Sequence, residues 1–191
     1  MRRKTFDALL TTAGLVVAVV LLVAGSLLAW GSSFVGTQVH DQLAAQKIFF
    51  PAAGSAGLGA KEFPGLQQYG GQQLVTGAQA EAYANQYIAV HINALAGGKT
   101  YSQLSTESRA NPTDTKLAGQ VDTVFRGETL RGLLLNAYAF GTIGRIAGYA
   151  AIAALVASAL MFALSLLGLV HLRRTGDDDQ LGAPAREAIT V

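Results

Sequence analysis

The sequence predicts an all-α membrane protein with two transmembrane helices and an extracytoplasmic helical domain between them. Two apolar stretches without a charged side chain, residues 9–30 and 146–170, carry this prediction. A helix rises about 1.5 Å per residue, so about 20 apolar residues cross the ~30 Å hydrocarbon core of a bilayer. Composition agrees, because 51% of the 191 residues are hydrophobic and 14% are charged, whereas a soluble domain has about 25% charged residues.

The predicted chain has five parts. The segment between the apolar stretches is polar and long enough for one small domain with a modest core. In order, the parts are a cytoplasmic N-terminus (1–8), a first transmembrane helix (9–30), the extracytoplasmic domain (31–145), a second transmembrane helix (146–170) and a cytoplasmic disordered tail (171–191).

Basic residues at both ends set the predicted orientation. Arg3 and Lys4 precede the first apolar stretch, and Arg173 and Arg174 follow the second. Positive residues in short flanking segments stay on the cytoplasmic side of a membrane. We therefore expect a plasma-membrane protein with both termini in the cytoplasm and the middle segment outside.

Two further residues are expected to set the depth of the helices. Trp30 fits an interfacial anchor at headgroup level, and Arg145 fits a side chain that extends to the headgroups. An ion pair with a partner, or an anionic lipid head, is the alternative for Arg145. A cleaved secretory signal is the alternative for the first stretch, although such apolar regions are usually only ~7 to 15 residues long.

The middle segment reads as a series of helices. Helical spacing continues from the first span as far as Pro51, after which glycines predict a mobile stretch to about Gly71. Thr76 is a predicted N-cap for a helix to about Ala96. Residues 99–112 read as a loop. Thr113 or Asp114 then caps a helix that enters the second span without a clear break.

Small residues indicate close packing of the apolar helices. In lipid, where hydrophobicity gives no net drive for association, glycine and alanine let helix backbones approach. The two helices could pack on each other, or they could offer this surface to another membrane protein. The residues in question are Gly25, Ala29, Gly144, Gly148 and Ala151.

An apolar pocket is a further hypothesis for the middle segment. Phe49 and Phe50 precede the glycine-rich stretch, and Tyr83 and Tyr87 lie one helical turn apart. These side chains could close on a lipid or a small apolar ligand. They could equally form an ordinary core cluster.

The sequence offers no set of residues that points to catalysis, a cofactor or a metal. The histidines at positions 40, 91 and 171 have no metal-ligand spacing. The nucleophile elbow Gly-x-Ser-x-Gly, the Walker A loop and the dinucleotide fingerprint do not occur. The chain has no cysteine, which excludes disulfides and thiolate sites. Its basic residues form no stripe, so nucleic acid is not an expected partner.

The chain resembles one group of proteins. The run from Thr123 to Tyr138 and the opening Arg3 to Asp7 resemble small two-pass membrane proteins of actinobacteria. The resemblance covers most of the chain and implies the same two-pass topology, but no activity. Some members of that group bear the name aromatic ring-opening dioxygenase. This sequence lacks the two-histidine, one-carboxylate set that holds such an iron, and so does not support that activity.

Together these observations predict a non-enzymatic accessory or scaffolding subunit of a larger plasma-membrane complex. It would contact the bilayer and another integral membrane protein through its small-residue transmembrane faces and its outer helical domain. The alternative is an extracytoplasmic module that binds or senses a lipid or small apolar ligand. An enzyme would require titratable groups that converge in a cleft.

Overall fold

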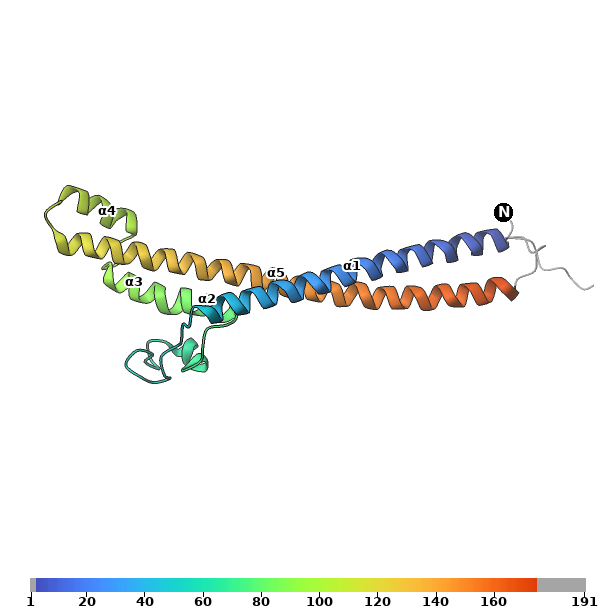
Figure 1. Cartoon of the computed structure of the whole chain (residues 1–191), viewed down its shortest axis with the longest axis horizontal. Helices are drawn as coiled ribbons and strands as arrows, with labels where there is room; N and C mark the ends of the chain where they lie inside the picture. The colour runs from blue at the N-terminus through green and yellow to red at the C-terminus, as the bar shows by residue number, and fades with distance from the viewer. Residues whose placement is uncertain (1–2, 175–191) are drawn as a thin grey trace, which may run out of the picture. The chain divides into compact units, whose positions relative to one another are not determined.

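The computed structural model describes residues 3–174, and the elements of this part are all helices (Figure 1). The predicted all-α class is therefore confirmed. Extended backbone pairs only at an isolated bridge between Phe49 and Gln73 in this part of the chain. The order is α1 (Arg3–Ala45), the 3-10 helix η1 (Pro64–Tyr69), α2 (Gly77–Ala82), the π-helix η2 (Tyr83–Ile88), α3 (Ala89–Leu95), α4 (Tyr101–Ala110) and α5 (Thr115–Arg174).

The chain forms two compact units, which we describe separately. The apolar unit comprises residues up to 31 and from 147 onward, and the middle unit comprises residues 32–146. Both α1 and α5 contain a stretch that is long and apolar enough to cross a membrane, by length and composition. The predicted C-terminal tail lies outside the described residues from position 175 onward.

Helix α1 ends at Ala45, before the predicted stop at Pro51. Lys47 has a positive φ of 52°, which turns the chain out of the helix. The amides of Phe50 and Leu74 then donate to the carbonyls of Gln72 and Ile48, at 2.9 Å each. This backbone pairing, which helical periodicity cannot reveal, replaces the last expected turn of the helix.

The glycine-rich stretch after Pro51 is packed, although the sequence predicts it to be mobile. Leu58 and Leu66 are fully buried in the core, and Phe63 is nearly so. The Gln67 amide nitrogen donates to the carbonyls of Leu58 (3.1 Å) and Phe63 (2.9 Å), and its oxygen accepts from the Gly54 amide (3.0 Å). These apolar residues follow no regular spacing, so the sequence pattern does not show that they are buried.

The helix predicted to begin after Thr76 is confirmed. The Thr76 hydroxyl accepts from the Gln79 amide, and the Gln79 side chain accepts from the Thr76 amide, which makes a capping box. The helix passes through α2, η2 and α3 and ends where Gly97 and Gly98 adopt positive φ values of 60° and 78°. It packs closely on α5, because a Cβ at Gly127 would lie 2.5 Å from Ile92.

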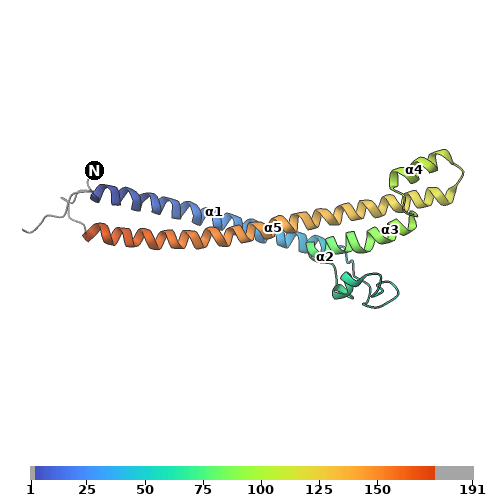
Figure 2. The same cartoon turned by 180° about the vertical axis from the view of Figure 1, so that it is seen from behind.

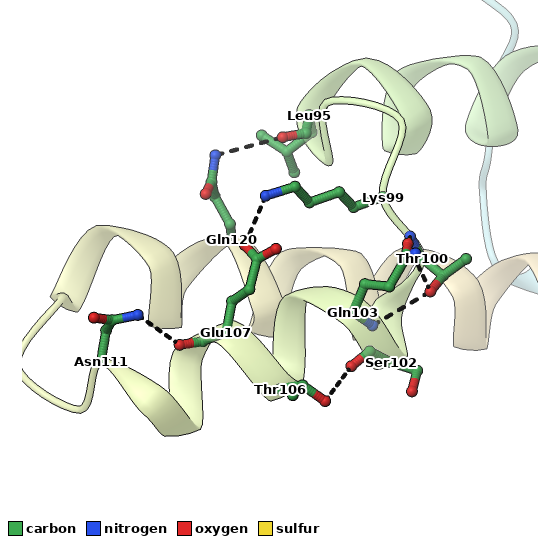
Figure 3. A network of polar contacts seen from close by, with 9 residues as sticks. All are labelled: Leu95, Lys99, Thr100, Ser102, Gln103, Thr106, Glu107, Asn111 and Gln120. Atoms are coloured by element: carbon green, nitrogen blue, oxygen red, sulfur yellow. Dashed lines mark hydrogen bonds and ion pairs between the residues drawn. The ribbon is translucent and has the colours of Figure 1, made fainter.

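The prediction of a loop over residues 99–112 is wrong, because this segment contains α4 (Figure 3). Thr100 and Gln103 form a second capping box, and Lys99 pairs with Glu107 at 2.7 Å. Only Leu104 of this helix is buried. The helix therefore has no apolar stripe, the pattern by which helices are recognised in a sequence. Its Thr-x-x-Gln capping box, however, was visible in the sequence.

Of the two N-caps predicted for α5, Asp114 is the one used: its carboxylate accepts from the Leu117 amide at 2.9 Å. The helix continues without a break to Arg174, as the sequence suggests. Its first turns lie beside α4 in both views, where the rings of Tyr101 and Phe125 stand 5.6 Å apart (Figures 1 and 2).

Truncation of Leu66 tests whether the glycine-rich stretch is packed. Leu66→Ala removes fully buried methyl groups and should cost about 2–5 kcal/mol of local stability. Trypsin should then cleave at Lys61 much faster than in the wild-type chain, as followed by mass spectrometry of timed digests. Leu95→Ala, at a side chain that is 40% exposed, is the control and should leave the rate unchanged. Equally fast cleavage in all three proteins would show that the stretch is open.

Candidate functional site

Small residues let α1 and α5 approach closely in the apolar unit. A Cβ built on Gly25 would lie 2.9 Å from Leu155 Cγ and 3.2 Å from its backbone nitrogen. A Cβ on Gly14 would lie 2.7 Å from the Ser165 hydroxyl. Such distances leave no room for a side chain, so only glycine permits this separation of the backbones. We call this contact the small-residue seam.

The seam repeats every seven residues on α5. Ala151, Ser158 and Ser165 share this spacing, and each is buried. The Ser158 hydroxyl donates to the Ala18 carbonyl at 2.7 Å, which satisfies a buried polar group inside an apolar contact. A seven-residue repeat is the packing period of a left-handed coiled coil. The contacts run in opposite directions along the two helices, so the pair is antiparallel.

The predicted packing residues occupy several different environments. Gly25 and Ala151 lie in the seam, whereas Ala29 is exposed and Gly148 is half-buried. Gly144 belongs to the middle unit. In that unit, a Cβ built on Gly144 would lie 3.1 Å from Val35 Cγ1. The Gly144 carbonyl accepts a hydrogen bond from the Ser32 hydroxyl at 2.7 Å.

Sequence reasoning missed half of the seam. It passed over Gly14, Ala18, Ser165 and Gly168, because it looked for glycine pairs four residues apart. The seven-residue spacing of small residues was a signal that could have found Ala18, seven residues before Gly25, and Ser165, seven residues after Ser158, but it does not reach Gly14 or Gly168.

The predicted anchoring residues lie at the ends of the two apolar stretches. Trp30 is 69% exposed. Arg145 is exposed and donates to the Thr142 hydroxyl at 3.2 Å. Arg173 and Arg174 close the last turn of α5. Lys4 is half-buried near the start of α1, and Arg3, whose side chain lies outside the description, is the first residue of that helix.

Three of the four residues predicted to form an apolar pocket meet in the middle unit. Phe50 is buried and stands edge-on to Tyr83, with ring centroids 5.1 Å apart, and Tyr83 lies 4.8 Å from Tyr87. Phe49 points elsewhere and is 55% exposed, because successive residues of extended backbone face opposite sides. Burial, and secondarily the neighbouring Tyr87, raises the pKa of the Tyr83 phenol above its ordinary value.

Further rings complete this aromatic cluster. Tyr69 lies 5.2 Å from Phe50, and Phe63 stacks on His91 with a 5.6 Å centroid separation. His91 also lies 4.4 Å from Tyr87, one helical turn away, a spacing that was visible in the sequence. Phe63 and Tyr69 come from the irregular stretch, where no spacing in the sequence indicates that they join the cluster. The rings pack on one another, as in a core cluster.

Several grooves open on the middle unit, and two of them are lined by both α1 and α5. The first, of about 510 Å³, has three glycines in its wall, Gly36, Gly77 and Gly141, and it reaches Arg145. Close packing accounts for one of these glycines: a Cβ on Gly77 would lie 3.1 Å from the Ala137 carbonyl oxygen. A Cβ on Gly141 would lie 3.5 Å from Gly77 Cα, which is an ordinary van der Waals distance. We call this the Arg145 groove.

The second groove, of about 440 Å³, lies between α1 and α5. Three glutamines, Gln38, Gln42 and Gln46, follow one edge. Apolar side chains of α5 form the other edge, Leu133 and Phe140 among them. We call this the glutamine groove.

Charged residues of the middle unit form exposed pairs. Arg126 contacts Asp122 at 2.9 Å along α5, and Lys99 contacts Glu107 at 2.7 Å. Exposed pairs of this kind contribute little to stability, about 0–1 kcal/mol each. No group of three metal-ligating side chains occurs among residues 3–174.

Comparison of the chain with protein-family models, with curated proteins and with solved structures finds no match. The resemblance to two-pass proteins of actinobacteria therefore stays a prediction.

A cysteine pair tests the small-residue seam. A Cβ on Gly168 would lie 3.5 Å from Thr11 Cβ, within the range that a disulfide requires. In the otherwise cysteine-free chain, the double variant Thr11→Cys/Gly168→Cys should form an internal disulfide on mild oxidation, detected by mass spectrometry of the digested protein. The control is Thr12→Cys/Gly168→Cys, because Thr12 lies on an exposed face and should remain reduced. Equal oxidation of both pairs would contradict the antiparallel seam.

Proposed function

We propose that the chain is a two-pass plasma-membrane protein whose middle unit lies outside the cell and acts as an accessory or scaffolding subunit of a larger complex. Burial supports the membrane location. Only 11% of the most apolar window of α1 and 17% of that of α5 is buried, whereas a core helix would be mostly buried. Large apolar side chains such as Val20 and Leu160 instead face outward, as lipid contact requires.

The basic residues of the two helix ends support the orientation. Lys4 stands at the start of α1, and Arg173 and Arg174 stand at the end of α5. Because α1 and α5 are antiparallel in the apolar unit, these cations share one end of the helix pair. The positive-inside rule places that end in the cytoplasm.

Exposed apolar side chains of the middle unit are the observation that favours an interaction role. Phe125, Leu133 and Phe140 are each between 53% and 60% exposed, although they precede the apolar stretch of α5. Gly25 and Ala151 already pack in the contact between α1 and α5 of the same chain. A partner would therefore contact the remaining outward faces, together with these side chains of the middle unit.

A ligand-binding role is the second candidate, and the Arg145 groove favours it. Its mainly apolar wall ends at one exposed cation, which suits an amphiphile with an anionic head. The aromatic cluster is a less suitable site, because its rings already occupy the space between them.

Cysteine labelling of intact cells tests the orientation. Ser102→Cys, at an exposed position of α4, should react with a membrane-impermeant maleimide added outside. Arg173→Cys should react only after permeabilisation. The two variants serve as each other's controls, because expression and reagent are the same. Labelling of Arg173→Cys alone in intact cells would reverse the proposed orientation.

Purification of the tagged chain in gentle detergent tests the accessory role. We expect one or more membrane proteins to co-purify in a fixed ratio, measured by quantitative mass spectrometry, and to be reduced when Phe125 is replaced by Glu. Thr123→Glu, at an exposed position on the same helix, is the matched control. Recovery of the chain with a single anionic lipid, lost in Arg145→Gln, would favour the ligand-binding role instead.

A further inference from the structure

Three segments of the middle unit form the Arg145 groove. Gly36 and Val39 come from α1, Val75 comes from the segment before α2, and Gly141 and Arg145 come from α5. The lining residues of α5 lie three or four positions apart, so they share one face of that helix. All of them belong to residues 32–146. The groove is therefore complete within one compact unit of one chain.

Small residues leave much of this groove open. Gly36, Gly77 and Gly141 carry no side chain, and Ala78 carries only a methyl group. A Cβ built on Gly36 would meet no neighbouring atom within 4 Å. The volume of about 510 Å³ lies within the range of about 300–1,000 Å³ that is typical of small-molecule sites. An unbranched hydrocarbon chain suits such a wall, because it needs apolar contact and no hydrogen bonds.

Three polar side chains of the groove already have partners within the chain. The Thr76 hydroxyl caps α2, and the Thr142 hydroxyl accepts from Arg145 at 3.2 Å. His40 contacts Asp41 at 3.0 Å, and Asp41 does not line the groove. The wall is therefore better suited to hydrocarbon than to a ligand with many polar groups.

Arg145 supplies the permanent charge of the groove. Its side chain is exposed, and it pairs with no carboxylate in the described part of the chain. Arginine can bind a carboxylate through two parallel hydrogen bonds, and such charge-assisted bonds are stronger than neutral ones. One cation beside one apolar groove complements a ligand that has one hydrocarbon chain and one anionic head.

We propose that the Arg145 groove binds a fatty acid, which specifies the ligand for the binding role considered above. The carboxylate of the fatty acid bonds to the Arg145 guanidinium. The hydrocarbon chain lies along Gly36, Val39 and Gly141. Removal of this chain from water supplies affinity, and the arginine selects the charged head.

Photolabelling of the full chain in nanodiscs tests this site. The probe is laurate with a diazirine at its methyl end, and mass spectrometry of digests locates the labelled residues. We expect label within residues 36–40 or 75–78, and unlabelled laurate should displace it in a saturable manner. Dodecanol has the same chain without the charge, so about tenfold more of it should be needed for the same displacement.

Two pairs of variants test the two halves of the site. Gly36→Leu places a side chain in the open groove and should remove the saturable label. Gly132→Leu is its control, because a Cβ on this exposed glycine would also meet nothing within 4 Å, outside the groove. Arg145→Gln should abolish the preference for laurate over dodecanol. Arg126→Gln, at an exposed arginine of α5 outside the groove, should keep that preference.

Several results would overturn the fatty-acid site. Label confined to the apolar unit, equal displacement by laurate and dodecanol, or unchanged saturable label in Gly36→Leu would each do so. Stronger competition by dilauroylphosphatidylglycerol than by laurate would assign the groove to a two-chain lipid instead. The accessory role is tested separately, because it predicts partner proteins whose recovery depends on Phe125, which does not line this groove.

Discussion

Close approach of two apolar helices at glycine, alanine and serine is the constraint on which this protein depends. In the bilayer location that we propose, van der Waals contact and a few internal hydrogen bonds must replace the hydrophobic drive between apolar helices. Gly25 against Leu155, and the Ser158 hydroxyl on the Ala18 carbonyl, supply both. The middle unit has a similar contact of its own, where Ser32 bonds to Gly144 and holds its two chain ends together. Bringing the ends of the 32–146 segment together costs loop-closure entropy, which the packing of the middle unit must offset.

The sequence predicts most of the helices because their signals are local. Thr76, Asp114 and the glycines at 97 and 98 mark helix ends by the same capping chemistry in the sequence and in the structure. Helix α4 escaped prediction because it buries one side chain and is held by its capping box. The packed stretch around Leu58 and Leu66 depends on Gln67 bonding to distant carbonyls, which no periodic pattern encodes.

In the candidate sites, too, features with local sequence signals can be predicted, whereas features that depend on distant contacts cannot. Phe50, Tyr83 and Tyr87 could be grouped from the sequence, but their partners Phe63 and Tyr69 come from irregular backbone and could not. A groove depends on which helix faces remain uncovered after packing. The sequence alone therefore reveals neither the Arg145 groove nor the glutamine groove. Their chemistry differs: the Arg145 groove ends at a cation, whereas the glutamine groove carries only amides and apolar groups. The two faces of the middle unit are therefore suited to different occupants.

The central claim is that the outward faces of the paired apolar helices contact lipid. Spin labels at Val20 and Leu160, which are 60% and 61% exposed, report this directly by their collision with oxygen and with a water-soluble nickel chelate in bilayers. The account predicts high oxygen and low nickel access at both positions, and the reverse at Thr37 in the middle unit. Nickel access at positions 20 and 160 as high as at position 37 would contradict it.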